Sequence, residues 1–264
     1  MKHLLDALEQ LAPTELAGDW DNVGLLLDPG TVEEPRKLFL TIDLTEQTLD
    51  EAIDVGADFI IAYHPPLFVP FKRLTQANAK ERIILKAAAA GLPIYSPHTA
   101  LDNVAGGIND WLADGLGPGD RDAVDCETSA GRLVRFETKQ PLDEVVTRIR
   151  TYLGLDAVRL ARANGWVESV AICAGAGGSV IGEADADLLW TGEMSHHGVL
   201  AANARGASVV LCEHTNTERG YLPVLAKKLR NKLLLALSEG GTNEKVPEIV
   251  ISEFDRDPLS VQGA

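Results

Sequence analysis

Apolar residues in the first part of the chain fall into two alternating patterns. Continuous apolar runs at Lys37–Ile42 and Phe59–Ala62 have the length of strands, and segments with helical periodicity follow them at Thr45–Val55 and Asn78–Ala90. Thr45 has the chemistry of a helix N-cap. This order of strand, helix, strand and helix predicts a parallel sheet with helices on both faces.

The alternation continues after a segment rich in glycine and proline, Gly115–Asp122, where we expect a domain boundary. A strand is predicted over Arg132–Phe136, a helix over Leu142–Leu153 and another strand over Val158–Leu160, which together resemble a βαβ unit. The next apolar run, Val170–Ala174, ends in a glycine-rich turn. That turn either exposes backbone N–H groups to an anion or allows a strand and a helix to pack closely.

A histidine followed four residues later by a carboxylate occurs twice, as His98 with Asp102 and as His214 with Glu218. Each pair comes directly after an apolar run typical of a buried strand. Open α/β sheets hold ligands beyond the carboxyl ends of their strands, and imidazole with carboxylate suits divalent cations. The two pairs therefore predict a metal site, although both carboxylates could instead favour the first turns of the helices that follow.

The two halves of the chain share more than these pairs. Ala57–His64 and Ala186–Glu193 both begin with Ala-Asp, continue as an apolar run and end in polar residues. In each half, a helix, a glycine, a strand and a His-Thr dipeptide follow. We predict an α/β fold of two related lobes, residues 1–120 and 121–264, with mostly parallel sheets and the metal site in the cleft between them.

Three further histidines lie in settings suited to chemistry. His64 follows a strand, and the two prolines after it fix the backbone, so we predict a metal ligand rather than a histidine bonded to a loop carbonyl. His196 and His197 are predicted catalytic residues, but neighbours on a helix point about 100° apart. One of them would line the pocket as a proton shuttle or a donor to a ligand, and the other would pack or face solvent.

Several acidic residues lie at turns and strand ends without the same pairing. Asp19 and Asp21 belong to a run of turn-forming residues, and Asp43 lies at the exit of a strand. These carboxylates are available for contacts with metal ligands, and we do not predict that any of the three binds an ion directly.

The composition restricts the class of protein. With 24 Lys and Arg against 39 Asp and Glu among 264 residues, the net charge is -15, which disfavours nonspecific binding to nucleic acid or to an anionic membrane. No apolar stretch approaches the ~20 residues of a membrane span. The three cysteines, Cys126, Cys173 and Cys212, lack CxxC spacing and are typical of thiols in a reducing compartment, so a cytoplasmic location is predicted.

These motifs resemble those of the dinuclear-metal-centre family, whose members are called GTP cyclohydrolase 1 type 2 homologues or Nif3-like proteins. The segments that carry the resemblance occur in order along nearly the whole chain: Asp19–Gly24, Tyr63–Phe68, Tyr95–Asp102, Thr191–His197, Glu213–Gly220 and Ser252–Pro258. The resemblance implies a two-lobed α/β fold, two divalent cations per chain and a ring-shaped homohexamer. By position, one ion would be held by His64, Asp102 and Glu218, and the other by His214 and Glu218.

One position departs from the family pattern. The family often has two adjacent histidines where this chain has Tyr63 and His64. A neutral tyrosine is a poor ligand, so the second ion is in question, and His98 could compensate by binding the ion or by contacting a ligand. The donor types accommodate Zn, Fe, Mn, Co or Ni and do not distinguish among them.

The predicted function is that of a divalent-metal-dependent hydrolase with an unknown small-molecule substrate. A bound cation would polarise a substrate oxygen and activate water, and His98, His196 or His197 would move protons. The alternative is a noncatalytic metal-binding scaffold, or a regulatory or metal-handling protein. A serine hydrolase is disfavoured because the sequence has no GxSxG motif.

Overall fold

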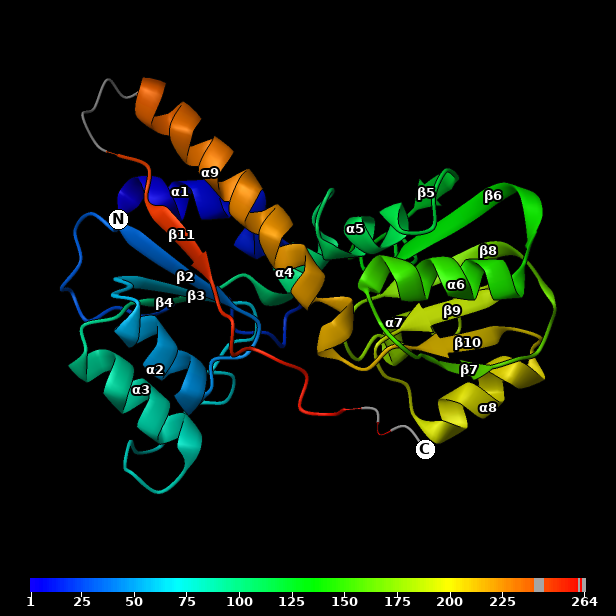
Figure 1. The fold of residues 1–264 in the computed structure, drawn as a ribbon, viewed down its shortest axis with the longest axis horizontal. Coiled ribbons are helices and arrows are strands. Elements are labelled where there is room, and N and C mark those ends of the chain that lie inside the picture. The colour runs from blue at the N-terminus through cyan, green and yellow to red at the C-terminus, as the bar shows by residue number, and fades with distance from the viewer. Residues whose placement is uncertain (240–244, 261, 263–264) are drawn as a thin grey trace. The chain divides into compact units, whose positions relative to one another are not determined.

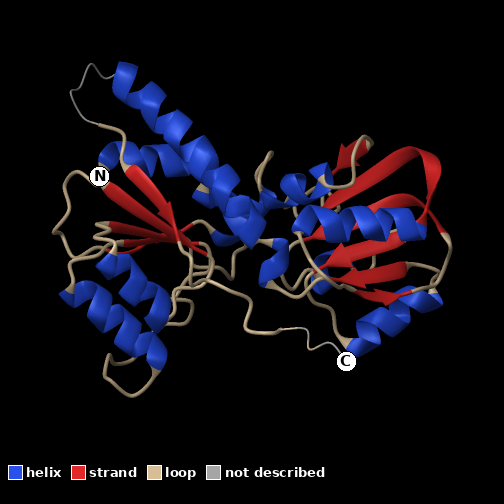
Figure 2. Ribbon diagram, viewed as in Figure 1, coloured by secondary structure: helices blue, strands red, loops and turns tan. Residues whose placement is uncertain are grey.

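The computed structural model describes residues 1–239, 245–260 and 262 (Figure 1). Their contacts divide the chain into two compact units. The first unit contains Met1–Leu101 and Tyr221–Asp255, and the second contains Asp102–Gly220 and Arg256–Ala264. Each unit is built on its own sheet, so the α/β class with two lobes is confirmed (Figure 2).

The sheet of the first unit has five strands. In spatial order they are β1 (Gly24–Leu27), β4 (Ile94–Ser96), β3 (Phe59–Ala62), β2 (Lys37–Thr41) and β11 (Glu248–Ile251). The last four are parallel to one another, and β1 pairs with β4 in the antiparallel direction. The carboxyl ends of β2, β3 and β4 therefore meet at one edge of the sheet.

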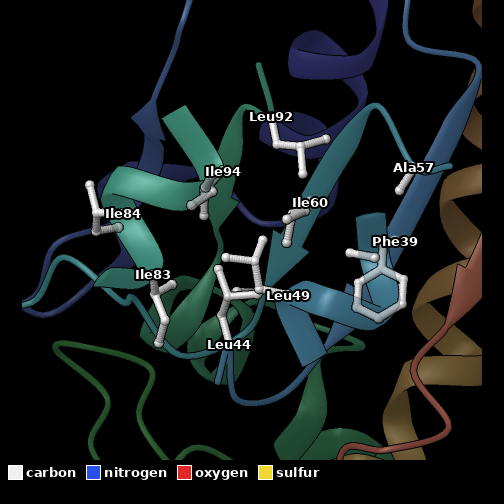
Figure 3. Packing of buried hydrophobic residues seen from close by; sticks show 12 residues of the cluster. Phe39, Leu44, Leu49, Ala57, Ile60, Ile83, Ile84, Leu92 and Ile94 are labelled. Carbon is white, nitrogen blue, oxygen red and sulfur yellow. The ribbon is translucent and has the colours of Figure 1, made fainter. Parts of the chain in front are cut away.

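Helices cover both faces of this sheet (Figure 1). They are α1 (Lys2–Leu11), α2 (Glu46–Asp54), α3 (Ala79–Ala89) and α9 (Leu222–Glu239). Helices α2 and α3 enclose an apolar cluster with the sheet, in which Phe39, Leu49 and Ile60 are fully buried (Figure 3). Burying each such side chain contributes roughly 1.5–3 kcal/mol.

Local sequence explains where the two helices on this face begin. The Thr45 side chain accepts a hydrogen bond from the Thr48 backbone N–H, and the Thr48 hydroxyl bonds back to the Thr45 N–H. Asn78 caps α3 by accepting from the Glu81 N–H. Both helices were predicted within one or two residues of these bounds, and the predicted N-cap role of Thr45 is confirmed.

The sheet of the second unit has six strands. In spatial order they are β5 (Asp120–Asp122), β6 (Arg132–Pro141), β8 (Trp166–Cys173), β9 (Leu188–Thr191), β10 (Ser208–Leu211) and β7 (Arg159–Ala161). Strands β8, β9 and β10 are parallel and lie at the centre, whereas the other pairings are antiparallel. Over both sheets, five of the nine strand pairings among the described residues are parallel.

Helices pack on this sheet as well. They are α5 (Ile108–Asp114), α6 (Leu142–Leu153), α7 (Gly178–Ile181) and α8 (His196–Ala204), while α4 (His98–Asn103) contains the division between the units. The described residues also form three short 3-10 helices: η1 (Thr14–Leu16), η2 (Thr215–Thr217) and η3 (Arg219–Tyr221). The predicted helix that begins after Pro141 is confirmed as α6, and Gly154 ends it in the left-handed conformation.

Two sequence-based expectations differ from this topology. The units do not follow the expected division into residues 1–120 and 121–264, because α5 packs on the second sheet while β11 pairs with β2. Strands β6 and β7, which were expected to form a βαβ-like unit with α6, are not neighbours in the sheet. Three strands lie between β6 and β7, and β7 pairs with β10 instead.

The internal resemblance has a structural counterpart. Strands β3 and β4 are parallel neighbours joined through α3, and β9 and β10 are parallel neighbours joined through α8. Asp58 precedes β3 and accepts backbone hydrogen bonds from the start of β2. Asp187 precedes β9 and accepts backbone hydrogen bonds from β8. The repeated Ala-Asp thus performs the same task twice, which is to align one parallel strand with its neighbour.

No helix among the described residues is both long enough and apolar enough to cross a membrane.

Candidate metal centre

His64 lies directly beyond β3, at the sheet edge where the parallel strands of the first unit end. Its Nδ1 lies 3.0 Å from Oδ1 of Asp43, which follows β2. A carboxylate at Nδ1 favours the tautomer whose proton is on Nδ1, so that Nε2 carries the lone pair that a cation binds. The expected contact between Asp43 and a predicted ligand is therefore confirmed.

His98 begins α4 at the end of the neighbouring strand, with a left-handed backbone φ of 27°. Its Nδ1 lies 2.7 Å from Oδ1 of Asp21, whose side chain is fully buried. The other oxygen of Asp21 accepts from the Thr99 N–H at 3.1 Å and from the Thr99 hydroxyl at 2.5 Å. Asp21 thus fixes both the ring and the backbone of the first turn, as a supporting carboxylate.

Tyr63 occupies the position that departs from the family pattern. Its ring is buried and lies beside two histidines, with its centroid 5.0 Å from that of His64 and 5.6 Å from that of His98. The two histidine rings are 5.4 Å apart. The tyrosine ring therefore packs against both imidazole rings.

Asp21 gives the first unit a pH-dependent contribution to stability. Burial opposes its ionisation, but hydrogen bonds from His98 and Thr99 outweigh burial and hold the pKa of Asp21 below its ordinary value of 3.8. A carboxyl with a lowered folded-state pKa stabilises the fold above its unfolded pKa, and this contribution is lost as the pH falls through the folded-state pKa.

We therefore expect Asp21→Asn to lower the free energy of unfolding at pH 7 by roughly 1.5–3 kcal/mol, the range for hydrogen bonds to charged groups. At pH 3, below the ordinary value of 3.8, the difference between the two proteins should be smaller, because the unfolded wild type takes up the Asp21 proton before the folded protein does. Urea unfolding at both pH values measures this. An equal difference at both pH values would show that the charge of Asp21 is not the cause.

A second prediction concerns the orientation of His64. Replacing Asp43 with Asn should weaken metal retention by roughly 10–100-fold, the usual effect of losing a carboxylate behind a histidine ligand. Competition with a chelator measures the affinity. Asp54→Asn, at the exposed end of α2, is the matched control and should retain metal like the wild type. Equal affinities in the two variants would separate Asp43 from the metal site.

In the second unit, His214 and Glu218 lie together beyond β10. Nε2 of His214 is 3.4 Å from Oε1 of Glu218, and Nδ1 of His214 is 3.3 Å from Oε2 of Glu193. The predicted pairing of His214 with a carboxylate four residues later is thus present. Glu218 is 1% exposed, so a carboxylate is held inside the protein beside an imidazole.

Backbone contacts fix the segment that carries this pair. The Gly175 N–H donates to the Thr217 hydroxyl at 2.8 Å, and that hydroxyl donates to the His214 carbonyl at 2.7 Å. Thr215 donates to a carboxylate of the C-terminal segment, Asp257, at 2.7 Å. The short 3-10 helix between His214 and Glu218 is therefore held from two sides within the second unit.

Asp102, in α4, belongs to the same unit. Its carbonyl accepts from the side chain of the buried Asn109 at 3.1 Å, and the other end of that amide accepts from the Ala174 N–H at 2.9 Å. Burial, with the carboxylates of Asp102 and Glu218 nearby, raises the pKa of the Cys173 thiol. Both predicted carboxylate ligands thus lie close to the end of β8.

The remaining predicted site residues are placed differently. His196 and His197 are both exposed at the start of α8, with ring centroids 5.4 Å apart. Glu193, three residues earlier, is the member of this cluster that reaches His214. Its role was missed, although the internal repeat aligns Glu193 with His64 and could have indicated it.

The residues present fit a divalent cation. The second unit brings together the imidazole of His214 and the buried carboxylate of Glu218, which are ligand types that Zn, Fe, Mn, Co and Ni accept. Gly175 leaves the donor atoms accessible: a Cβ at this position would lie 2.6 Å from Glu218 Oε1 and 2.9 Å from His214 Nε2. The absence of a side chain there leaves both donor atoms free of a close backbone substituent.

Fold and site define an α/β protein with two sheets, each of which presents histidine–carboxylate pairs at the carboxyl ends of its parallel strands. The chain belongs to the Duf34/NIF3 (NGG1p interacting factor 3) family, whose model matches residues 1–246. The Nif3-like resemblance of the motifs is therefore confirmed.

Relatives and solved structures agree with this assignment. The chain is 40% identical to NIF3-like protein 1 of Drosophila melanogaster, over 96% of this chain and 86% of the relative. It is also 40% identical to the NIF3 homolog of Schizosaccharomyces pombe, over 97% and 96% of the two chains. A Bacillus cereus protein related to NIF3 matches the structure with a TM-score of 0.83 at 20% identity, over 99% of this chain and 98% of the other. That likeness establishes the fold.

Proposed function

We propose that the chain is a divalent-metal-dependent hydrolase that acts on a small molecule. His64, His214 and Glu218 supply imidazole and carboxylate donors, which are ligand types that divalent cations accept. In the proposal, His64, Asp102 and Glu218 hold one ion and His214 and Glu218 hold the other, as the family resemblance implies. Tyr63, which stands where the family often has a histidine, packs against two histidines. The first quantity to measure is therefore the number of ions per chain.

One observation carries the proposal. His64, His98 and His214 each have Nδ1 facing a carboxylate oxygen, at 3.0, 2.7 and 3.3 Å. Histidines that bind metal or move protons are commonly oriented in this way, because the carboxylate fixes the tautomer and raises the basicity of Nε2. A histidine with a merely structural role requires no such partner, and here the arrangement occurs at three different strand ends.

The chain's own residues would then have separate tasks. When bound, a divalent cation supplies Lewis acidity and lowers the pKa of water. His98, whose Nδ1 is held by Asp21, would accept and return a proton at Nε2. Asp43 and Glu193 would keep His64 and His214 oriented. His196 and His197 remain predicted proton carriers, and their exposure suits exchange with solvent.

The proposal extends to the setting of the protein. We infer a cytoplasmic homohexamer, as the resemblance implies, with a small-molecule substrate rather than nucleic acid or a membrane. The net charge of -15 supports this, because it opposes binding to polyanions.

The test is metal content per chain, measured on protein purified without chelator or added metal, with Tyr63→His alongside. Two ions in the wild type support a dinuclear hydrolase in which Tyr63 is tolerated. One ion that rises to two in Tyr63→His indicates a mononuclear protein. No ion in either protein overturns the proposal. Hydrolysis of phosphate and carboxylate p-nitrophenyl esters by the wild type and by His98→Gln then tests catalysis itself.

A further inference from the structure

We propose that Trp20 and Phe68 form a subsite that binds a flat aromatic ring of the substrate, next to His98. The inference rests on the proposed function, because it assigns a substrate class to the same site. It uses only residues of the first unit. We call these two side chains the aromatic pair.

The aromatic pair is exposed where large apolar rings are usually covered. Trp20 is 66% exposed and Phe68 is 40% exposed, and their ring centroids are 6.0 Å apart. The centroid of His98 lies 6.1 Å from that of Trp20 and 6.3 Å from that of Phe68. Both exposed rings therefore border the histidine that we propose as the proton carrier.

The rings of Trp20, Phe68 and His98 meet one another edge to face. Trp20 meets Phe68 at an interplanar angle of 66° and meets His98 at 84°, and Phe68 meets His98 at 85°. All three contacts are edge-to-face, and none is a parallel stack. Aromatic rings also pair in offset parallel stacks, so a flat ligand can stack on the aromatic pair without replacing an existing parallel contact.

Contacts with neighbouring residues fix the backbone turn that carries Trp20. A Cβ at Gly18 would lie 2.9 Å from Nε1 of the Trp20 ring, so the indole rests directly on this glycine. The Gly18 N–H donates to the Thr99 hydroxyl at 3.0 Å, and that hydroxyl donates to Asp21. The carboxylate that orients His98 therefore also anchors the turn that presents Trp20.

Phe68 is presented by the segment that follows His64. Its neighbour Leu67 accepts a hydrogen bond through its carbonyl from the side chain of Asn22, which ties this segment to the turn of Trp20. An open pocket of about 420 Å³ adjoins them, lined by Asp21, Asn22, Leu67, Phe68, Val69, Pro70 and Phe71. The turn before β1 and the segment after β3 are thus joined around one recess, which Phe68 lines.

An experiment with a flat probe and a matched puckered probe tests the subsite. The full chain is labelled with fluorotryptophan, which gives one fluorine NMR signal for each of its four tryptophans. The Trp20 signal is assigned by its loss in Trp20→Phe. Benzamide and cyclohexanecarboxamide are then titrated; both are uncharged and similar in size, but only the first has a flat ring. Trp166, which is 60% exposed in the second unit, is the internal control.

The expected result is a saturable shift of the Trp20 signal with benzamide, and an apparent Kd about tenfold or more weaker for cyclohexanecarboxamide, because stacking requires a flat face. The Trp166 signal should not move. Phe68→Leu and Gly18→Ala should both weaken benzamide binding, the first by removing a ring and the second by displacing the indole.

Three results would overturn the subsite. They are equal binding of the two probes, equal shifts of Trp20 and Trp166, and a Trp20 signal that changes on dilution of the protein alone, which would show that a second copy of the chain covers the pair. Metal content measured on the same samples separates this failure from that of the proposed function. Normal metal content without ring binding rejects the subsite only, whereas absent metal rejects the hydrolase.

Discussion

Replacing Gly175 with Ala is expected to abolish metal retention while leaving a folded protein. Gly175 has a left-handed φ of 59°, which costs an alanine about 1–2 kcal/mol. Its added Cβ would also lie 2.6 Å from Oε1 of Glu218 and 2.9 Å from Nε2 of His214, so both proposed donor atoms must move. We expect the metal affinity to fall by more than the roughly 10–100-fold that follows loss of a supporting residue.

The chain provides a matched control for the backbone contribution. Gly154 ends α6 with a φ of 66°, and a Cβ there would meet no atom within 4 Å. Gly154→Ala should therefore show the same loss of unfolding free energy from strain, with unchanged metal content. Urea unfolding and metal analysis of both variants separate the two effects. Normal metal content in Gly175→Ala would mean that His214 and Glu218 do not bind an ion together.

The strands that form the centre of each sheet could be predicted because they are buried on both faces. Such strands are continuous apolar runs, and β2 and β3 were recognised in this way. Pairing between distant segments could not be predicted from periodicity. Ile249 of β11 pairs with Leu38 of β2, and neither segment contains a sequence signal that identifies the other as its partner. The expected division at residue 120 differs from the compact units for this reason.

The site shows the same limit. Individual histidines and carboxylates at strand ends were visible in the sequence, and so was the availability of Asp21 and Asp43 as supporting residues. The contact between Glu193 and His214 depends on β9 and β10 being neighbours, which is a property of the sheet. The aromatic pair depends on contact between the turn before β1 and the segment after β3, and only the folded chain brings these two together.

Glu218→Gln should separate metal binding from folding most clearly. Glu218 is buried to 1% exposure, and an ionised carboxylate in such a place costs free energy unless it is paired or binds a cation. The amide has the same shape and no charge. Because the uncharged amide cannot neutralise a cation, we expect Glu218→Gln to keep its fold and to bind metal far more weakly than the wild type.

The measurement is the free energy of unfolding with and without added Zn, after removal of bound metal. A ligand at 100 times its Kd stabilises the folded state by about 2.7 kcal/mol, so the wild type should gain this amount and Glu218→Gln almost none. Glu168→Gln, whose carboxylate is 53% exposed on β8, is the isosteric control and should gain as much as the wild type. If Glu218→Gln gains equally, the ion is held elsewhere. If the metal-free variant is instead strongly destabilised, the buried carboxylate supports the fold itself, and His214 beside it is a structural partner rather than a ligand.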